Sequence, residues 1–262
     1  MTGAVSPGIT ALCADTLARM RRHAAGLAGF GALAAGLVAL SLHVPGWAGA
    51  LTLLAALWAV QAMVAVQIPG RAAPAATPQG MATFARVLSA CALLCLVLGF
   101  LLLLTLLTTT LVVIGVMAGS GFDFDLAGQA GEGFDQAMAA YRDTPGWLIC
   151  QGVFLFGLAV WVYGVARSLP FFAGVIAKRR VIVLEALNRS RGHGLKILAA
   201  LILVMTLPVL LAASGFRIAP ETGWMRAPME AIALLPAVYV AGAFLGALDI
   251  FVPGTETDPA VA

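Results

Sequence analysis

Residues Val87–Met117 read VLSACALLCLVLGFLLLLTLLTTTLVVIGVM, a run of 31 residues without a charged side chain. A helix crosses the hydrocarbon core of a bilayer with about 20 predominantly apolar residues. A helix over this stretch would be about 47 Å long at 1.5 Å per residue, which exceeds a core of about 30 Å. We therefore expect a spanning helix that tilts, bends at Gly99 or Gly115, or projects beyond the bilayer.

Five other stretches are long and apolar enough, or nearly so, to cross a membrane: residues 24–42, 44–66, 147–166, 197–214 and 231–248. Pro45 and Gly46 predict a tight turn that joins the first two as a helical hairpin. Pro208 and Pro236 free backbone groups in the last two stretches, so neighbouring helices must satisfy those groups. The first stretch exceeds the apolar core of a signal peptide, about 7–15 residues, so we expect a retained span.

Composition over the whole chain indicates the same class. Of 262 residues, 61% are hydrophobic and 10% are charged, and the mean hydropathy is +1.00. Soluble domains average about 25% charged residues, and disordered chains have low hydrophobicity, so both classes are excluded. The sequence predicts an all-α polytopic integral membrane protein. It would have six transmembrane helices and a cytoplasmic amphipathic helix, in a single membrane domain over residues 1–262.

Charged residues separate by side of the expected spans. Twelve basic and five acidic residues give one side a net charge of +7, and three basic and seven acidic residues give the other −4. Basic loops stay in the cytoplasm. We therefore expect both termini in the cytoplasm, residues 118–146 as an outer loop, and residues 167–196 as a basic inner segment.

The basic inner segment is the candidate binding surface. Pro170 is expected to start or kink a helix, and the mixture of cations and apolar residues suits the headgroup layer of a membrane. Its candidate lipid- or partner-binding residues are Lys178, Arg179, Arg180, Arg189, Arg191 and Lys196. The simpler interpretation is a topology anchor with an amphipathic helix on anionic headgroups, and the sharper one is a docking site for a partner or a specific lipid.

The same segment carries a family resemblance. Arg167-Ser-Leu-Pro170, Glu185-Ala-Leu-Asn-Arg-Ser190 and Arg191-Gly-His-Gly-Leu-Lys-Ile-Leu198 resemble a pattern in multi-pass bacterial proteins. The proteins with this pattern include the membrane domain of glycerophosphodiester phosphodiesterases and related six-span proteins of unknown function. The match covers about thirty residues and lacks the Trp and Leu-Thr usually found between the second and third motifs. Because that family's catalytic domain is a separate soluble unit without a match here, the resemblance implies a membrane scaffold.

Small residues and the outer loop give further expectations. Gly242 and Gly246 form a GxxxG pattern suited to helix packing, and Ala24, Ala28, Ala32 and Gly36 recur every four residues. Intramolecular packing is the simpler interpretation of both patterns, and self-association is the alternative. In the outer loop, Phe134, Met138 and Tyr141 predict a short amphipathic helix over residues 132–142.

Residues that carry chemistry are sparse. His23, His43 and His193 show no metal-site spacing, and Asp123 and Asp125 lack the bidentate Glu of a calcium loop. We therefore expect no catalytic residue, cofactor, metal site or nucleic-acid partner. Glu230 and Asp249 flank the last span, where each is expected to reach water.

The leading hypothesis is a non-enzymatic scaffold, or a partner- or lipid-binding component, of the bacterial inner membrane. Its expected partners are the bilayer, anionic lipid headgroups, and a protein partner or a second copy of the chain. The alternative is a small-solute transporter or channel, with a path near the last span and the threonines at 105, 108 and 109.

Overall fold

The computed structural model describes residues 8–68, 78–129, 131–178, 180–181, 183–219 and 225–251. Of these described residues, 87% are helical, and the same ranges contain no strand. Among the described residues, six helices are long and apolar enough to cross a membrane, which confirms the predicted all-α polytopic class. They are α2 (Ala24–Ser41), α3 (Gly46–Ala65), α4 (Pro78–Gly119), α7 (Pro145–Ser168), α10 (Gly194–Ile218) and α11 (Arg226–Ala247).

The described residues also form shorter helices: α1 (Ile9–Arg22), α5 (Phe124–Ala127), α6 (Gly133–Tyr141), α8 (Pro170–Lys178), α9 (Val183–Arg189) and the 3-10 helix η1 (Leu248–Phe251). The residue contacts gather in two compact units. Unit 1 comprises residues 1–94 and 166–262, and unit 2 comprises residues 95–165.

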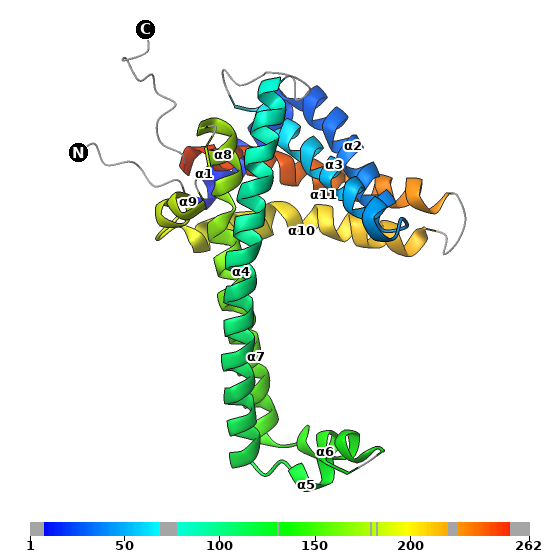
Figure 1. The fold of residues 1–262 in the computed structure, drawn as a ribbon, viewed down its shortest axis with the longest axis vertical. Coiled ribbons are helices and arrows are strands. Elements are labelled where there is room, and N and C mark those ends of the chain that lie inside the picture. The colour runs from blue at the N-terminus through cyan, green and yellow to red at the C-terminus, as the bar shows by residue number, and fades with distance from the viewer. Residues whose placement is uncertain are drawn as a thin grey trace, which may run out of the picture. The chain divides into compact units, whose positions relative to one another are not determined.

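Unit 1 is a helical bundle centred on α11. The predicted hairpin is present, because α2 ends at Ser41 and α3 begins at Gly46, whose φ of 69° suits glycine. Helix α11 packs against α2, α3, α10 and α1, and α10 and α11 lie side by side (Figure 1). Leu12 of α1, Ile197 of α10 and Phe244 of α11 meet in one buried cluster.

The buried face of α2 differs from the one that the sequence suggested. Ala24, Ala28 and Ala32 are exposed, so this stripe of small residues does not pack inside the chain. The buried residues are instead Leu27, Gly31, Ala34, Ala35 and Ala39. Helix α2 is apolar on every side, so its sequence does not mark which face is covered.

The segment that follows α7 lies largely inside unit 1. A helix does start at Pro170, as expected, and every residue of α8 from Pro170 to Ala177 is buried. Helix α8 packs against α3, α11 and η1. The structure therefore does not show an amphipathic helix on a cytoplasmic surface. The reason is composition: Phe171–Ala177 carries no charge, so every side of α8 can be buried.

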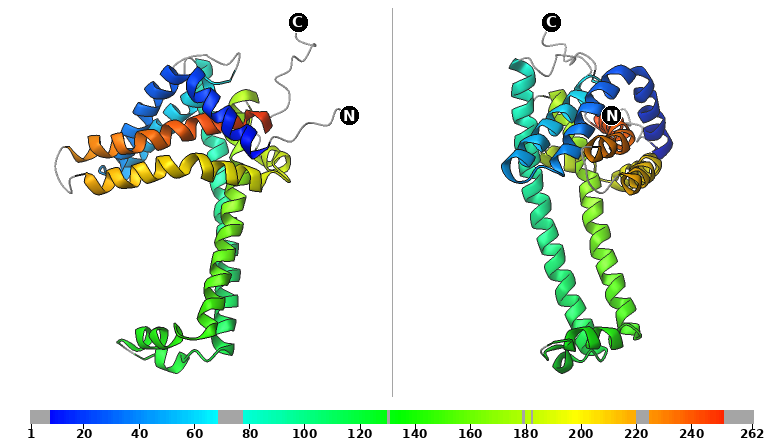
Figure 2. Two further views of the ribbon diagram at one scale, coloured as in Figure 1. Left: turned by 180° about the vertical axis from the view of Figure 1, so that it is seen from behind. Right: turned by 90° about the vertical axis from the view of Figure 1, so that its right-hand side faces the viewer.

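In unit 2, residues 95–119 of α4 and 145–165 of α7 form an antiparallel pair, with α5 and α6 across their connected ends (Figure 2). The pair packs closely where Gly157 lies against Thr105 and Thr109. Trp161 Nε1 also donates to the Leu98 carbonyl, at 3.4 Å. Helix α4 continues through Gly99 and Gly115 without interruption, so neither glycine ends it.

Candidate functional site

Helices α5 and α6, which we call the cap, close over one end of the α4–α7 pair. Asp123 Oδ1 accepts a 2.8 Å hydrogen bond from the Leu126 backbone N–H, which caps the start of α5. Two glycines permit close approach. A side chain at Gly133 would meet the Leu126 carbonyl, and one at Gly146 would meet Ser120 and Tyr141. The cap thus has two close contacts at glycines, one with a backbone carbonyl and one with side chains, that leave no room for a Cβ.

An aromatic and polar cluster fixes the cap to the two long helices. Phe122 makes edge-to-face contacts with Phe124 and Tyr141, at centroid distances of 4.8 and 5.4 Å. The Tyr141 hydroxyl lies 2.6 Å from Ser120 Oγ of the loop after α4, and 3.7 Å from Cys150 Sγ of α7. Burial raises the pKa of Tyr141, although the hydrogen bond to Ser120 opposes the shift. Tyr141 therefore remains neutral at ordinary pH.

Two apolar pockets adjoin beneath the cap, and together we call them the cap pocket. One, of about 510 Å³, is lined by cap residues, including Phe124, Phe134 and Met138, and by residues of α4 and α7. The other, of about 540 Å³, is lined by Val113, Trp147, Cys150, Gln151, Phe154 and Leu155. Val113, Trp147 and Cys150 line both. Each volume lies within the range of about 300–1,000 Å³ that is usual for ligand pockets.

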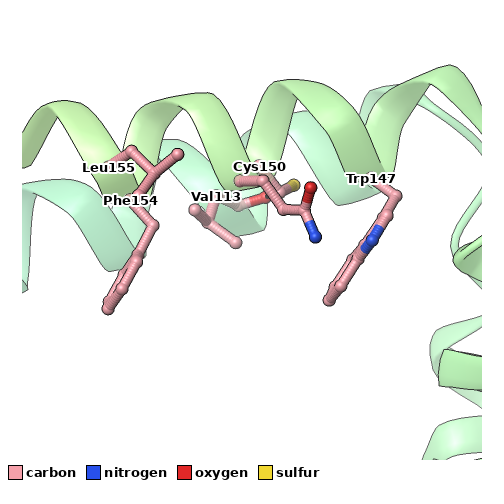
Figure 3. Close-up of a pocket in the computed structure, with 6 residues that line it drawn as sticks. Val113, Trp147, Cys150, Phe154 and Leu155 are labelled. Carbon is pink, nitrogen blue, oxygen red and sulfur yellow. Dashed lines mark hydrogen bonds between the residues drawn. The ribbon is translucent and has the colours of Figure 1, made fainter.

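The part of the cap pocket along α7 opens beside an apolar helix face. Figure 3 shows the rings of Trp147 and Phe154 projecting from α7 in the same direction, with Val113 and Cys150 between them. The side chains of α7 next to the pocket are exposed, among them Leu155 (61%) and Phe156 (72%). In a spanning helix such side chains face lipid or another protein.

The sequence predicted part of this site. It indicated the helix that carries Phe134, Met138 and Tyr141, and the structure forms that helix as α6. It gave no sign of the pocket, which needs contacts between α4, α7 and the cap. Trp147, at the start of an apolar span, was the one local signal, because Trp is enriched where a helix leaves the bilayer.

A first ionic cluster lies at one end of unit 1. Glu230 of α11 is 3% exposed; it accepts a 2.9 Å hydrogen bond from Arg226 Nε, and its other oxygen lies 2.6 Å from His43 Nε2. The expectation that Glu230 reaches water is therefore wrong. The α2–α3 turn places His43 over the first turns of α11. This is a tertiary contact, so the sequence around Glu230 does not predict it.

A second ionic cluster lies at the other end of α11. Arg19 of α1 bridges Asp15 and Asp249, with N···O distances of 2.8 Å to each. Near it, Gln67 donates from Nε2 to the carbonyls of Met63 and Gly242, at 2.8 and 3.0 Å.

The GxxxG glycines of α11 lie against α3. A Cβ at Gly242 would meet the Met63 side chain, and one at Gly246 would meet the Gln67 amide. The two glycines therefore serve packing within one chain.

Several predicted binding cations have partners in the chain. Lys178 Nζ and Arg180 Nη2 lie 3.2 and 3.1 Å from the two oxygens of Glu185. One carboxylate thus neutralises part of the charge expected to face lipid. Arg191 is exposed and Lys196 is half-buried. Arg179 lies outside the described residues, as does the side chain of Arg189.

Within the described ranges, no group of three or more His, Cys, Asp or Glu residues is placed to hold a metal ion. Neither the protein-family models, nor the curated proteins, nor the solved structures compared with this chain match it. The resemblance of residues 167–198 to the phosphodiesterase membrane domain thus stays a prediction.

Proposed function

We propose that this chain is a non-enzymatic, lipid-binding scaffold of a bacterial inner membrane. The observation that carries the proposal is the cap pocket, an apolar site built from two spanning helices and a folded cap. At the α7 end its walls hold the Gln151 amide and the Cys150 thiol, and under the cap Tyr141 lines it, with its hydroxyl 2.6 Å from Ser120 Oγ. Such walls suit the binding of hydrocarbon.

The scaffold part of the proposal rests on how unevenly the spans are covered. In the most apolar window of α11, 44% of the residues are buried, against 17% in α4 and 11% around α7. Unit 1 thus has an interior of its own, whereas much of the surface of α4 and α7 is available to lipid or to a partner. A protein partner or a second copy would bind most readily along this pair.

The proposed orientation places both termini in the cytoplasm and the cap outside. It is supported by the charge difference of +7 against −4 between the two sides of the expected spans. A topology reporter inserted at Gly131, in the loop between α5 and α6, should give an external signal. A reporter at the C-terminus should give an internal one, and reversed signals would contradict the orientation.

A transport path is less well supported by the packing. Thr105 and Thr108 donate within α4, to the carbonyls of Leu101 and Leu104, at 2.8 and 2.9 Å. Thr105 and Thr109 also face Gly157 of α7 at close contact, so two of the three threonines are packed against α7, while Thr108 is exposed. At the last span, Glu230 and Asp249 are both held by cations.

One reconstitution experiment tests lipid binding against transport. The purified full chain is placed in liposomes of mixed phospholipids, extracted in a mild detergent, and examined by native mass spectrometry. We expect phospholipid to stay bound after extraction, and the intact liposomes to show no flux of ions or small solutes above protein-free controls. Loss of all lipid, together with solute flux, would refute the proposal.

A further inference from the structure

We propose that the cap pocket binds one acyl chain of a phospholipid whose headgroup carries an amine. This inference rests on the proposed function and names its ligand. It commits to a lipid taken from the leaflet next to the cap, rather than to a soluble apolar molecule.

The shape of the pocket suits a chain. Its lining residues on α7 run from Trp147 to Leu155, which corresponds to about 12 Å along the helix at 1.5 Å per residue. At its Trp147 end, where Val113, Trp147 and Cys150 line both halves, it adjoins the half under the cap that Phe134 and Met138 line. A pocket long in one direction and apolar on its walls matches a run of methylenes better than a compact polar solute.

The pocket also needs an apolar occupant. Water inside it would find few polar partners, and an empty space would forfeit dispersion contacts along the walls. Because the pocket opens beside exposed side chains of α7 such as Leu155, the hydrocarbon of the bilayer is its nearest supply. An acyl chain of a lipid in the adjacent bilayer is therefore the expected occupant of the pocket.

The cap distinguishes this site from an ordinary contact with surrounding lipid. A plain groove between two helices would leave a lipid free to exchange along its whole length. Here Phe122 and Ser120, in the loop after α4, hold Tyr141 of the cap through a ring contact and a 2.6 Å hydrogen bond, and the Tyr141 hydroxyl lies 3.7 Å from Cys150 Sγ of α7. A chain that enters the pocket is thus covered by folded protein, and it should leave more slowly than its neighbours.

Charge on the cap favours one class of headgroup. Residues 118–146 contain five acidic side chains and one basic side chain, a net charge of −4. Four of the acids lie on the two short helices or at their start: Asp123, Asp125, Glu132 and Asp135. This field repels anionic headgroups and attracts an ammonium group. A zwitterionic ethanolamine lipid therefore fits better than an anionic glycerol lipid.

Photo-cross-linking of the full chain in nanodiscs tests the site. The probes are phosphatidylethanolamine and phosphatidylglycerol that carry a diazirine near the end of one acyl chain. The test variant is Val113→Trp, which fills both halves of the pocket. Its matched control is Val112→Trp, the same change at an adjacent position of α4 that is 50% exposed and does not line the pocket. Ala127→Leu fills the pocket from the cap, in case the α4 variant misfolds.

For the wild type, we expect ethanolamine-lipid adducts on peptides covering residues 113–117 and 134–155. Val113→Trp and Ala127→Leu should reduce these adducts by about tenfold, the loss expected when about two methylenes are no longer buried, and Val112→Trp should not. The glycerol lipid should label the wild type several-fold less.

Each contrary result has a separate meaning. Equal labelling of the Val112 and Val113 variants, with lipid still retained in native mass spectra, would overturn the pocket while leaving lipid binding in place. Equal labelling by the two lipids would overturn the headgroup assignment. A wild type without adducts or retained lipid would overturn this inference and the proposed function together.

Discussion

Adding one methyl group at each glycine of the α11 GxxxG pattern should have unequal effects. Both glycines are buried against α3, but their neighbours differ. At Gly242 the new Cβ meets the methyl end of Met63, a flexible group with no hydrogen bond to lose. At Gly246 it meets the side-chain amide of Gln67, which is held by hydrogen bonds to the carbonyls of Met63 and Gly242.

The expected size of the difference follows from those contacts. Displacing Gln67 removes two hydrogen bonds, together worth about 1–2 kcal/mol in a membrane protein. Overpacking adds about 1–3 kcal/mol, and replacing Gly by Ala within a helix returns about 1 kcal/mol. Gly246→Ala should therefore lower the free energy of unfolding by about 1–4 kcal/mol, and Gly242→Ala should change it by less than about 1 kcal/mol.

Unfolding in mixed micelles by titration with sodium dodecyl sulfate, followed by circular dichroism, measures both variants. A double-mutant cycle with Gln67→Ala supplies the control, because removing the amide should relieve the clash. The cycle should give a coupling energy of at least about 1 kcal/mol for Gly246 and none for Gly242. Equal destabilisation by the two alanines, or additivity at Gly246, would refute the account of this interface.

Three further predictions concern the ionic clusters and the cap. Glu230→Ala should lower the free energy of unfolding by about 2 kcal/mol in the same titration, because two buried hydrogen-bonding contacts are lost. The control Glu132→Ala, at an exposed site, should change the free energy of unfolding by less than about 0.5 kcal/mol. Burial raises the pKa of Tyr141 in the folded chain above its ordinary value of 10.0. The neutral side chain therefore contributes to the free energy of unfolding below pH 10, and this contribution is lost as the pH rises through the raised pKa. An ultraviolet titration should show this late ionisation in the wild type, and Tyr141→Phe should abolish it. Glu185→Gln removes the carboxylate shared by Lys178 and Arg180. Native mass spectra should then show more anionic lipid bound per protein. An unchanged number of bound anionic lipids would contradict a role for these cations in lipid binding.

The spanning helices could be predicted because their signal is local. A run such as Val87–Met117 has no soluble alternative, and Pro45 with Gly46 marks the turn of the first hairpin without reference to anything else in the chain. The helix that carries Phe134 and Tyr141 was visible for the same reason, since its apolar spacing lies within nine residues.

The packing within the membrane could not be predicted in this way. Helix α2 is apolar all round, so the choice between its Ala28 face and its Leu27 face is made by α3 and α11, not by its own sequence. Glu230 looked like a residue at a water boundary, and only the position of His43 shows that it is buried. The cap pocket needs Val113 and Trp147, which are far apart in the sequence, to line one space.

The polar contacts of unit 1 have a common physical role along α11. Apolar helices in lipid can slide past one another at little cost, because one methyl contact replaces another. Helix α11 and η1 carry polar contacts at Glu230, Tyr239, Gly242 and Asp249, made with the α2–α3 turn, α1 and the end of α3. A shift of α11 by one turn, about 5.4 Å, would break all of them at once and leave buried polar groups unpaired. These contacts therefore set the register of the bundle, while the apolar surface supplies its packing.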